Sequence, residues 1–165
     1  MALRGLLTFD LVGPMAHFRK FYTNSSSLSY VLPPRTTLCG VLASLLGYKR
    51  DEYYEELSLE QAQIGVALRT PVRTIMQTVN YLFTKNEGWD GSQGHTQIPV
   101  NFVLPKPPER LIRYRVYLSL ANEALMRRLY QQLRGGRYQY PLYLGVTECP
   151  AWVENPHLYA SEELD

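Results

Sequence analysis

The order of predicted elements indicates an α+β protein of the ferredoxin-like βαββαβ type, a two-layer sandwich in which two helices cover an antiparallel sheet. Three observations predict this class. Segments rich in β-branched and aromatic residues occur in the order strand, helix, strand, insertion, strand, helix, strand. Residues 111–120 alternate between apolar and polar side chains, as a half-buried strand does. Residues 36–46 and 123–133 carry apolar side chains at helical spacing.

The first strand is predicted over Leu3–Val12 and ends at Gly13-Pro14, because proline lacks the donor that a ladder needs. A polar and aromatic loop, Met15–Leu32, follows it. The first helix is predicted over Thr36–Leu46, with a threonine at or near its N-cap. Gly47 suits the position after its last turn, where a left-handed residue is common.

The second strand is predicted after an acidic segment. This segment, Asp51–Gln63, has the spacing of a capping box, with Ser58 three residues before Gln61, and we expect a short exposed helix. β-Branched residues return over Ile64–Val79, and Pro71 within them indicates a bulge or an edge position.

The third strand follows an inserted hairpin. Residues 80–108 form two strand-like arms around a tip that contains glycine, and we expect a hairpin between the second and third strands. The third strand, Leu111–Leu120, has one apolar face. The side chains on this face are those of Ile112, Tyr114, Val116, Leu118 and Leu120.

The second helix, Glu123–Leu133, is predicted to be capped by Asn122. A last strand over Leu142–Thr147 leads to an acidic tail. The expected organisation is therefore one domain over residues 1–151 and a tail over residues 152–165.

The charge is unevenly distributed, although the net charge of the 165 residues is only +2. Residues 1–50 hold six bases and one acid, and residues 64–147 hold eleven bases and four acids. Residues 51–63 and 148–165 hold five acids each and no base. Thirteen of the bases are arginines and the chain has thirteen tyrosines, a combination suited to phosphates and bases. We expect the basic stretches, including Arg113 and Arg115, to face RNA and the acidic ones to lie away from it.

The loop after the first strand is the densest candidate for a binding site. It combines His17, Arg19 and Lys20 with aromatic rings and hydroxyl groups, the mixture that single-stranded RNA requires. An ordinary surface loop is the alternative at this point. Arg35 and the helix start at Thr36-Thr37 form a second candidate, because free backbone N–H groups and the helix dipole favour phosphate.

Arg69, Arg73 and Gln77 are spaced by four along the predicted second strand, so we expect them on one face. Catalytic motifs are scarce by comparison. The three histidines have no metal-ligand spacing, and Cys39 and Cys149 are too far apart to suggest a zinc site. No apolar run has the length of a membrane span. We expect no metal, no cofactor and no membrane contact, with the cytosol as the compartment.

Four segments of the chain resemble the CRISPR-associated Cas five family, most closely its type I-B branch. The segments are GPMAHFRKFYTNSSSLSYVLPPRTTLCGVLASLLGY (Gly13–Tyr48), IGVALRTPVRTIMQTVNYL (Ile64–Leu82), QIPVNFVLPK (Gln97–Lys106) and YPLYLGVTECPA (Tyr140–Ala151). The resemblance covers most of residues 1–151. Family members often continue well past this point.

The resemblance implies a non-catalytic subunit of the type I interference complex, Cascade, in the prokaryotic cytoplasm. Such a subunit has an RNA-recognition fold with a thumb hairpin and caps the 5′ handle of the crRNA. It contacts the terminal backbone subunit and the large subunit that reads the PAM, and target DNA near the PAM-proximal end is a further possible partner. The residues expected to bind RNA are His17, Arg19, Lys20, Tyr22, Ser25, Arg35, Thr36, Thr37, Arg69, Arg73, Gln77, Tyr81 and Trp89.

Two other classes stay open. The first is a metal-independent endoribonuclease that processes precursor crRNA, with His17 or His95 as the base and Lys20 at the phosphate. The second is a scaffold subunit whose contacts with RNA are incidental.

Overall fold

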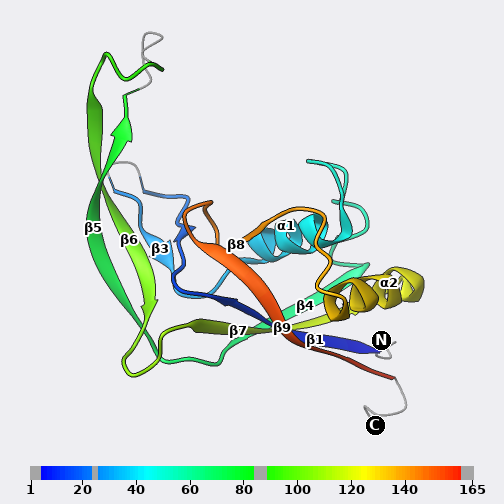
Figure 1. The fold of residues 1–165 in the computed structure, drawn as a ribbon. Coiled ribbons are helices and arrows are strands. Elements are labelled where there is room, and N and C mark those ends of the chain that lie inside the picture. The colour runs from blue at the N-terminus through cyan, green and yellow to red at the C-terminus, as the bar shows by residue number, and fades with distance from the viewer. Residues whose placement is uncertain (1–4, 24–25, 84–88, 161–165) are drawn as a thin grey trace.

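The central feature is a five-stranded antiparallel sheet with the strand order β4-β7-β1-β9-β8 (Figure 1). It is seen in a computed structural model that describes residues 5–23, 26–83 and 89–160. The strands are β1 (Leu6–Gly13), β4 (Ala62–Leu68), β7 (Ile112–Leu120), β8 (Leu142–Tyr143) and β9 (Pro150–Tyr159). Two helices, α1 (Arg35–Leu46) and α2 (Glu123–Arg134), contribute to the same hydrophobic core. The mixed α/β class predicted from the sequence is confirmed.

The hairpin stands apart from this sheet. Strands β5 (Val72–Leu82) and β6 (His95–Pro105) pair with each other as a separate two-stranded sheet, whose far end extends away from the helices in Figure 1. The hairpin is longer than the predicted insertion of residues 80–108, because the expected second strand divides into β4 and β5. The division lies at residues 69–71, where Arg69 N–H donates to the Arg113 carbonyl (2.9 Å).

The core confirms the strongest local patterns. The five apolar side chains predicted for β7 are all at most 2% exposed. They share their face with Leu7 and Phe9 of β1, which pair with Leu118 and Val116. Helix α2 adds Leu129, and the side chain of Asn122 accepts a hydrogen bond from Leu125 N–H (3.0 Å), which confirms the predicted cap. The apolar face of the sheet is therefore sealed by the helices.

Two local expectations for the first half are wrong. Helix α1 begins after Pro34, which makes no side-chain cap, so no threonine caps it; its end at Gly47 (φ 81°) is as predicted. The acidic segment of residues 51–63 forms a series of turns up to the start of β4, and the capping box at Ser58 does not start a helix. The carbonyl of Ser58 instead accepts a hydrogen bond from Arg35.

The C-terminal segment is also different from the expected tail. The predicted strand Leu142–Thr147 shortens to β8, and residues 150–159 form β9, which pairs with β1. Strand β9 fits the sheet because Val153 and Leu158 lie opposite Leu11 and Leu7 and pack against the core. The acidic side chain of Glu154 in this strand forms an ion pair with Arg113 of β7.

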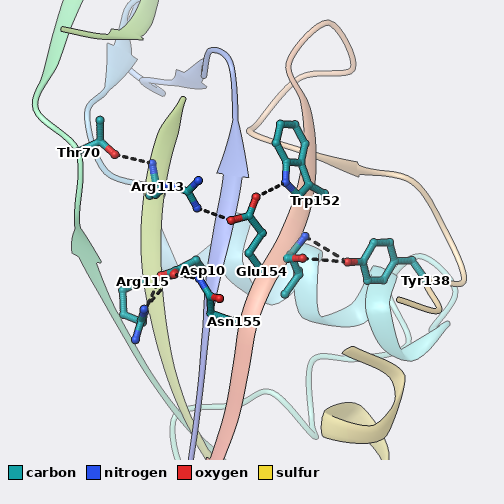
Figure 2. A network of polar contacts seen from close by, with 9 residues as sticks. Asp10, Thr70, Arg113, Arg115, Tyr138, Trp152, Glu154 and Asn155 are labelled. Carbon is teal, nitrogen blue, oxygen red and sulfur yellow. Dashed lines mark hydrogen bonds and ion pairs between the residues drawn. The ribbon is translucent and has the colours of Figure 1, made fainter. Parts of the chain in front are cut away.

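A polar network lies on the sheet face opposite the helices (Figure 2). Arg115 binds the carboxylate of Asp10 through Nε (2.5 Å) and Nη2 (2.9 Å), and Asn155 donates to the same carboxylate (3.0 Å). Arg113 pairs with Glu154, which also accepts a hydrogen bond from the indole of Trp152 (2.7 Å). The basic strand β7 is therefore neutralised by acids of β1 and β9, contrary to the expectation that it faces RNA.

The two carboxylates of this network make the fold sensitive to acid. Burial raises the pKa of Asp10, but the bonds from Arg115 and Asn155 outweigh it and hold the pKa below its usual range. The bonds from Arg113 and Trp152 lower the pKa of Glu154 in the same way. A lowered carboxyl pKa stabilises the fold above the usual value of about 4, and this stabilisation is lost as the pH falls through the lowered value.

We therefore expect the free energy of unfolding to decrease as the pH falls below about 5 and through the lowered pKa values of these groups. Urea denaturation followed by circular dichroism measures this. Asp10→Asn should be less stable at pH 7 and should show a shallower decrease. Glu148→Gln, which changes an exposed carboxylate outside the network, is the control and should keep the wild-type slope. A wild-type stability that is flat over this range contradicts the role given to the network.

Candidate RNA-binding groove

A groove lies between the loop after β1 and the β5–β6 hairpin. Its cavity has a volume of about 330 Å³. Its lining combines a cation, hydroxyl groups, an aromatic ring and apolar walls. The lining residues are His17, Arg19, Ser26, Ser27, Tyr81, Ile98 and Val146. Segments far apart in the sequence thus meet here, and three of the residues predicted to bind RNA are among them.

The loop is joined to the hairpin by backbone hydrogen bonds. Ala16 and Val103 exchange two N–H···O bonds (3.0 and 2.8 Å). Ser27 N–H donates to Pro99 O (2.8 Å), and Asn101 N–H donates to Ser27 O (2.8 Å). Strand β6 is therefore held on one side by β5 and on the other by the loop. This arrangement fixes the two walls of the groove relative to each other.

The floor of the groove depends on a close approach of two backbone segments. His17 N–H donates to the carbonyl of Leu144 (3.0 Å) in the turn after β8. The next residue, Gly145, has a φ of 100°, and a Cβ built on it would overlap the carbonyl oxygen of His17. Only glycine fits this position, because it tolerates positive φ and leaves room for the neighbouring backbone. Val146 then reaches the groove.

The loop places cations and aromatic rings at the mouth of the groove. Arg19 is exposed on β2 (Phe18–Arg19), which pairs with β3 (Ser29–Tyr30). The Lys20 ammonium lies 5.8 Å from the ring centre of Tyr22 and 5.5 Å from that of Tyr30. Phe21 is 88% exposed and meets Tyr22 edge to face. Exposed rings beside cations are what stacked bases and phosphates require.

The hairpin contributes a face of alternating residues. Arg73, Gln77 and Tyr81 lie on the same side of β5, since side chains two or four residues apart share a face. Tyr81 reaches the groove, and all three are exposed. Arg69 does not belong to this row, because it precedes the hairpin and its backbone bonds to β7. Arg69 therefore does not share the strand of Arg73 and Gln77, on which the expectation of one face depended.

Arg35 is turned inward, in contrast to the phosphate contact expected for it. Its Nη2 lies within hydrogen-bonding distance of three carbonyls, those of Leu57 (2.9 Å), Ser58 (3.0 Å) and Ala62 (3.0 Å). A guanidinium that donates to several carbonyls of one segment stabilises the turns that it holds. Arg35 therefore anchors the acidic turns to the start of α1. Its neighbour Thr36 is exposed, and Thr37 lines a different cavity between α1 and β8.

Other predicted residues lie away from the cavity or outside the described chain. Trp89 is 72% exposed at the far end of the hairpin. Ser25 falls outside the described residues. The sequence reasoning missed Ser26, Ser27, Ile98 and Val146, which line the cavity. Alternation in β6 could have placed Ile98 on the face of Tyr81, but nothing in the sequence brings Val146 to this groove.

The three histidines, two of which are candidate catalytic bases, lie in separate parts of the fold. Both ring nitrogens of His17 are already hydrogen-bonded, and the residue is 3% exposed. His95 begins β6 and His157 lies on β9, so the three rings come from separate elements. Within the described residues, no group of three or more histidine, cysteine or acidic side chains could hold a metal ion. No helix in the same part of the chain is long and apolar enough to cross a membrane.

The sequence profile of the family described as CRISPR-associated protein (Cas_Cas5) matches residues 6–164. The chain therefore belongs to the CRISPR-associated Cas5 family, the Cas five family that its motifs resemble. A search of curated proteins finds no match.

Solved structures share the fold at low sequence identity. One titled "CRISPR RNA-guided surveillance complex" has a TM-score of 0.58 and 16% identity over 87% of this chain and 58% of the other. A type III-B Cmr-beta structure "bound to cognate target RNA" has a TM-score of 0.55 and 12% identity over 95% of this chain and 61% of the other. A further structure, "Crystal structure of Cas protein", aligns at 22% identity over 89% of this chain and 62% of the other, but its TM-score of 0.49 is too low to show a shared fold. The chain spans about three-fifths of the length of these proteins.

Proposed function

We propose that this chain is the RNA-binding subunit of a type I CRISPR interference complex and that its groove binds the 5′ handle of the crRNA. The observation that carries the proposal is the meeting of Arg19, Tyr81 and the Ser26-Ser27 hydroxyls around one cavity. Arg19 would bind phosphate, Tyr81 would stack on a base, and the hydroxyls would bond to base edges or to the 2′-OH. Phe21, Tyr22 and Lys20 would extend this contact along the rim.

The topology supports a ferredoxin-like, RNA-recognition-type fold with a thumb. Taking β1, β4, β7 and β9 as the four strands of the βαββαβ unit, the order β4-β7-β1-β9 has strands one and three at the centre, with antiparallel neighbours. The hairpin β5–β6 lies between the second and third of these strands, where the thumb is expected.

The partners would be the backbone and large subunits of the complex, with target DNA near the PAM-proximal end. One fold relative is titled as an RNA-guided surveillance complex and another as bound to cognate target RNA, and this supports a role within a complex. The branch is proposed to be type I-B, on the motifs of the sequence.

We propose that the subunit does not cut RNA. Catalysis by the alternative ribonuclease requires a base with a free ring nitrogen near the phosphate. The nitrogens of His17 are both occupied, and Lys20 lies beside two aromatic rings at the rim. These contacts favour a binding site over a nuclease.

The test is a binding titration of the purified chain with labelled RNA that carries the repeat-derived 5′ sequence, at several salt concentrations and in EDTA. We expect saturable binding that weakens linearly with the logarithm of the salt concentration, by about 0.7 per phosphate contact for a single strand. The RNA should be recovered intact. A DNA strand of the same sequence is the control and should bind more weakly, because it lacks the 2′-OH. Equal affinity for unrelated DNA would contradict handle recognition, and specific cleavage abolished by His17→Ala or His95→Ala would establish the ribonuclease.

A further inference from the structure

His17 connects the two walls of the groove through its imidazole ring. Its Nδ1 lies 2.9 Å from the carbonyl oxygen of Asn101 on β6. Its Nε2 lies 2.8 Å from Oγ of Ser27 in the loop. The ring also contacts Phe102, with 5.8 Å between the ring centres. One buried side chain thus touches the hairpin on one side and the loop on the other.

The partners determine where the protons lie. A carbonyl oxygen only accepts, so Nδ1 must donate to Asn101. In the neutral ring Nε2 then accepts from the Ser27 hydroxyl, and in the charged ring it donates to the same oxygen. Both protonation states are satisfied within the protein. No ring nitrogen is left to bind a phosphate or a base.

The position of this connection matters for the residues that face the ligand. Ser27 and Ser26 line the groove on the loop side, and Ile98 and Tyr81 line it on the hairpin side. His17 bonds to Ser27 itself and to Asn101, three residues from Ile98. Loss of the ring would leave the backbone bonds between loop and hairpin but would remove the side-chain connection beneath the cavity.

We propose that His17 is a positioning residue, which holds the β5–β6 hairpin and the loop at the separation that RNA binding needs, and that it does not touch the RNA. The proposal rests on the proposed function of the groove. It replaces the direct contact expected from the sequence. A ligand that contacts two walls binds more tightly when the walls are already fixed, because less conformational entropy is lost on binding.

The test compares His17→Ala with Arg19→Ala in RNA binding across a salt series. Arg19→Ala should lower the salt slope by about 0.7, because one phosphate contact is lost. His17→Ala should weaken binding about 10-fold at every salt concentration and leave the slope unchanged. His17→Leu, which fills part of the space of the ring without its hydrogen bonds, should weaken binding in the same way and serves if His17→Ala does not fold. His17→Asn should recover part of the affinity, because its amide can donate to Asn101.

A second measurement separates this inference from the function of the groove. Amide hydrogen exchange should accelerate at Asn101 and Val103 in His17→Ala, with or without RNA, because their N–H groups bond to the loop. Unchanged exchange overturns the inference even if RNA binds. A salt slope that falls as it does in Arg19→Ala also overturns it and makes His17 a ligand. If the wild type does not bind RNA but exchange accelerates in His17→Ala, the proposed function is overturned. The role of His17 in connecting the loop to the hairpin is then retained.

Discussion

Arg19→Glu is expected to weaken binding of the handle RNA by about 10- to 100-fold, the equivalent of about 1–3 kcal/mol. Arg19 is exposed at the mouth of the groove, and within the described residues no acidic side chain pairs with it. Its guanidinium is therefore free for phosphate, and a carboxylate in its place would repel the RNA. Fluorescence anisotropy with labelled RNA at constant salt measures the change.

The matched control for this variant is Arg50→Glu. The side chain of Arg50 is 95% exposed and lies beside the acidic turns, outside the groove. Both variants change the net charge equally, so the general electrostatic attraction of the chain for RNA falls by a similar amount in each. The difference between them reports the contact at the groove. Equal losses of affinity in the two variants would contradict the placement of the phosphate at Arg19.

Gly145→Ala is expected to lower the free energy of unfolding by about 3 kcal/mol or more, since it combines a disfavoured positive φ with a steric overlap. The added Cβ would overlap the carbonyl oxygen of His17, so the turn after β8 and the start of the loop must move apart. Urea denaturation gives the loss of stability. Weaker RNA binding should accompany it, because this turn and His17 form the floor of the groove.

Gly136→Ala separates the two causes. Gly136 also has a positive φ, 61°, but a Cβ built on it meets no atom within 4 Å. Only the backbone cost remains there, about 1 kcal/mol. If Gly145→Ala is no more harmful than Gly136→Ala, the close approach at the floor of the groove is not needed for the fold.

Local patterns allowed part of the fold to be predicted. The alternation of β7 and the cap at Asn122 depend on neighbouring residues, and both are confirmed. Strand β9 was missed because its stability depends on β1 and on the pairing of Glu154 with Arg113, 41 residues away. The acidic composition of residues 152–165 indicated a solvent-exposed tail, because the sequence does not show that Glu154 pairs with Arg113.

The candidate site, like the fold, could be predicted only in part. Arg19 and Tyr81 were recognised from their residue types and reach the cavity. Arg35 was predicted to bind phosphate because its position at the start of a helix suggested an anion site. Its guanidinium instead donates hydrogen bonds to carbonyls 22–27 residues further along the chain. Val146 was missed because only the approach of Gly145 to His17 brings it to the groove. Residue type therefore indicated which side chains are suited to binding RNA. Contacts between distant parts of the chain determine which of these side chains reach the groove.

The pairing of β1 with β9 has a consequence for biosynthesis. Leu11 of β1 lies opposite Val153 of β9, so the sheet joins residues that are synthesised 142 positions apart. Closing so long a loop carries a large entropic cost, and sheets built from such distant contacts fold slowly. Until β9 leaves the ribosome, β1 has only β7 beside it and the polar network on the open face lacks Glu154 and Asn155. The sheet that supports the groove would therefore be complete only after β9 has been synthesised.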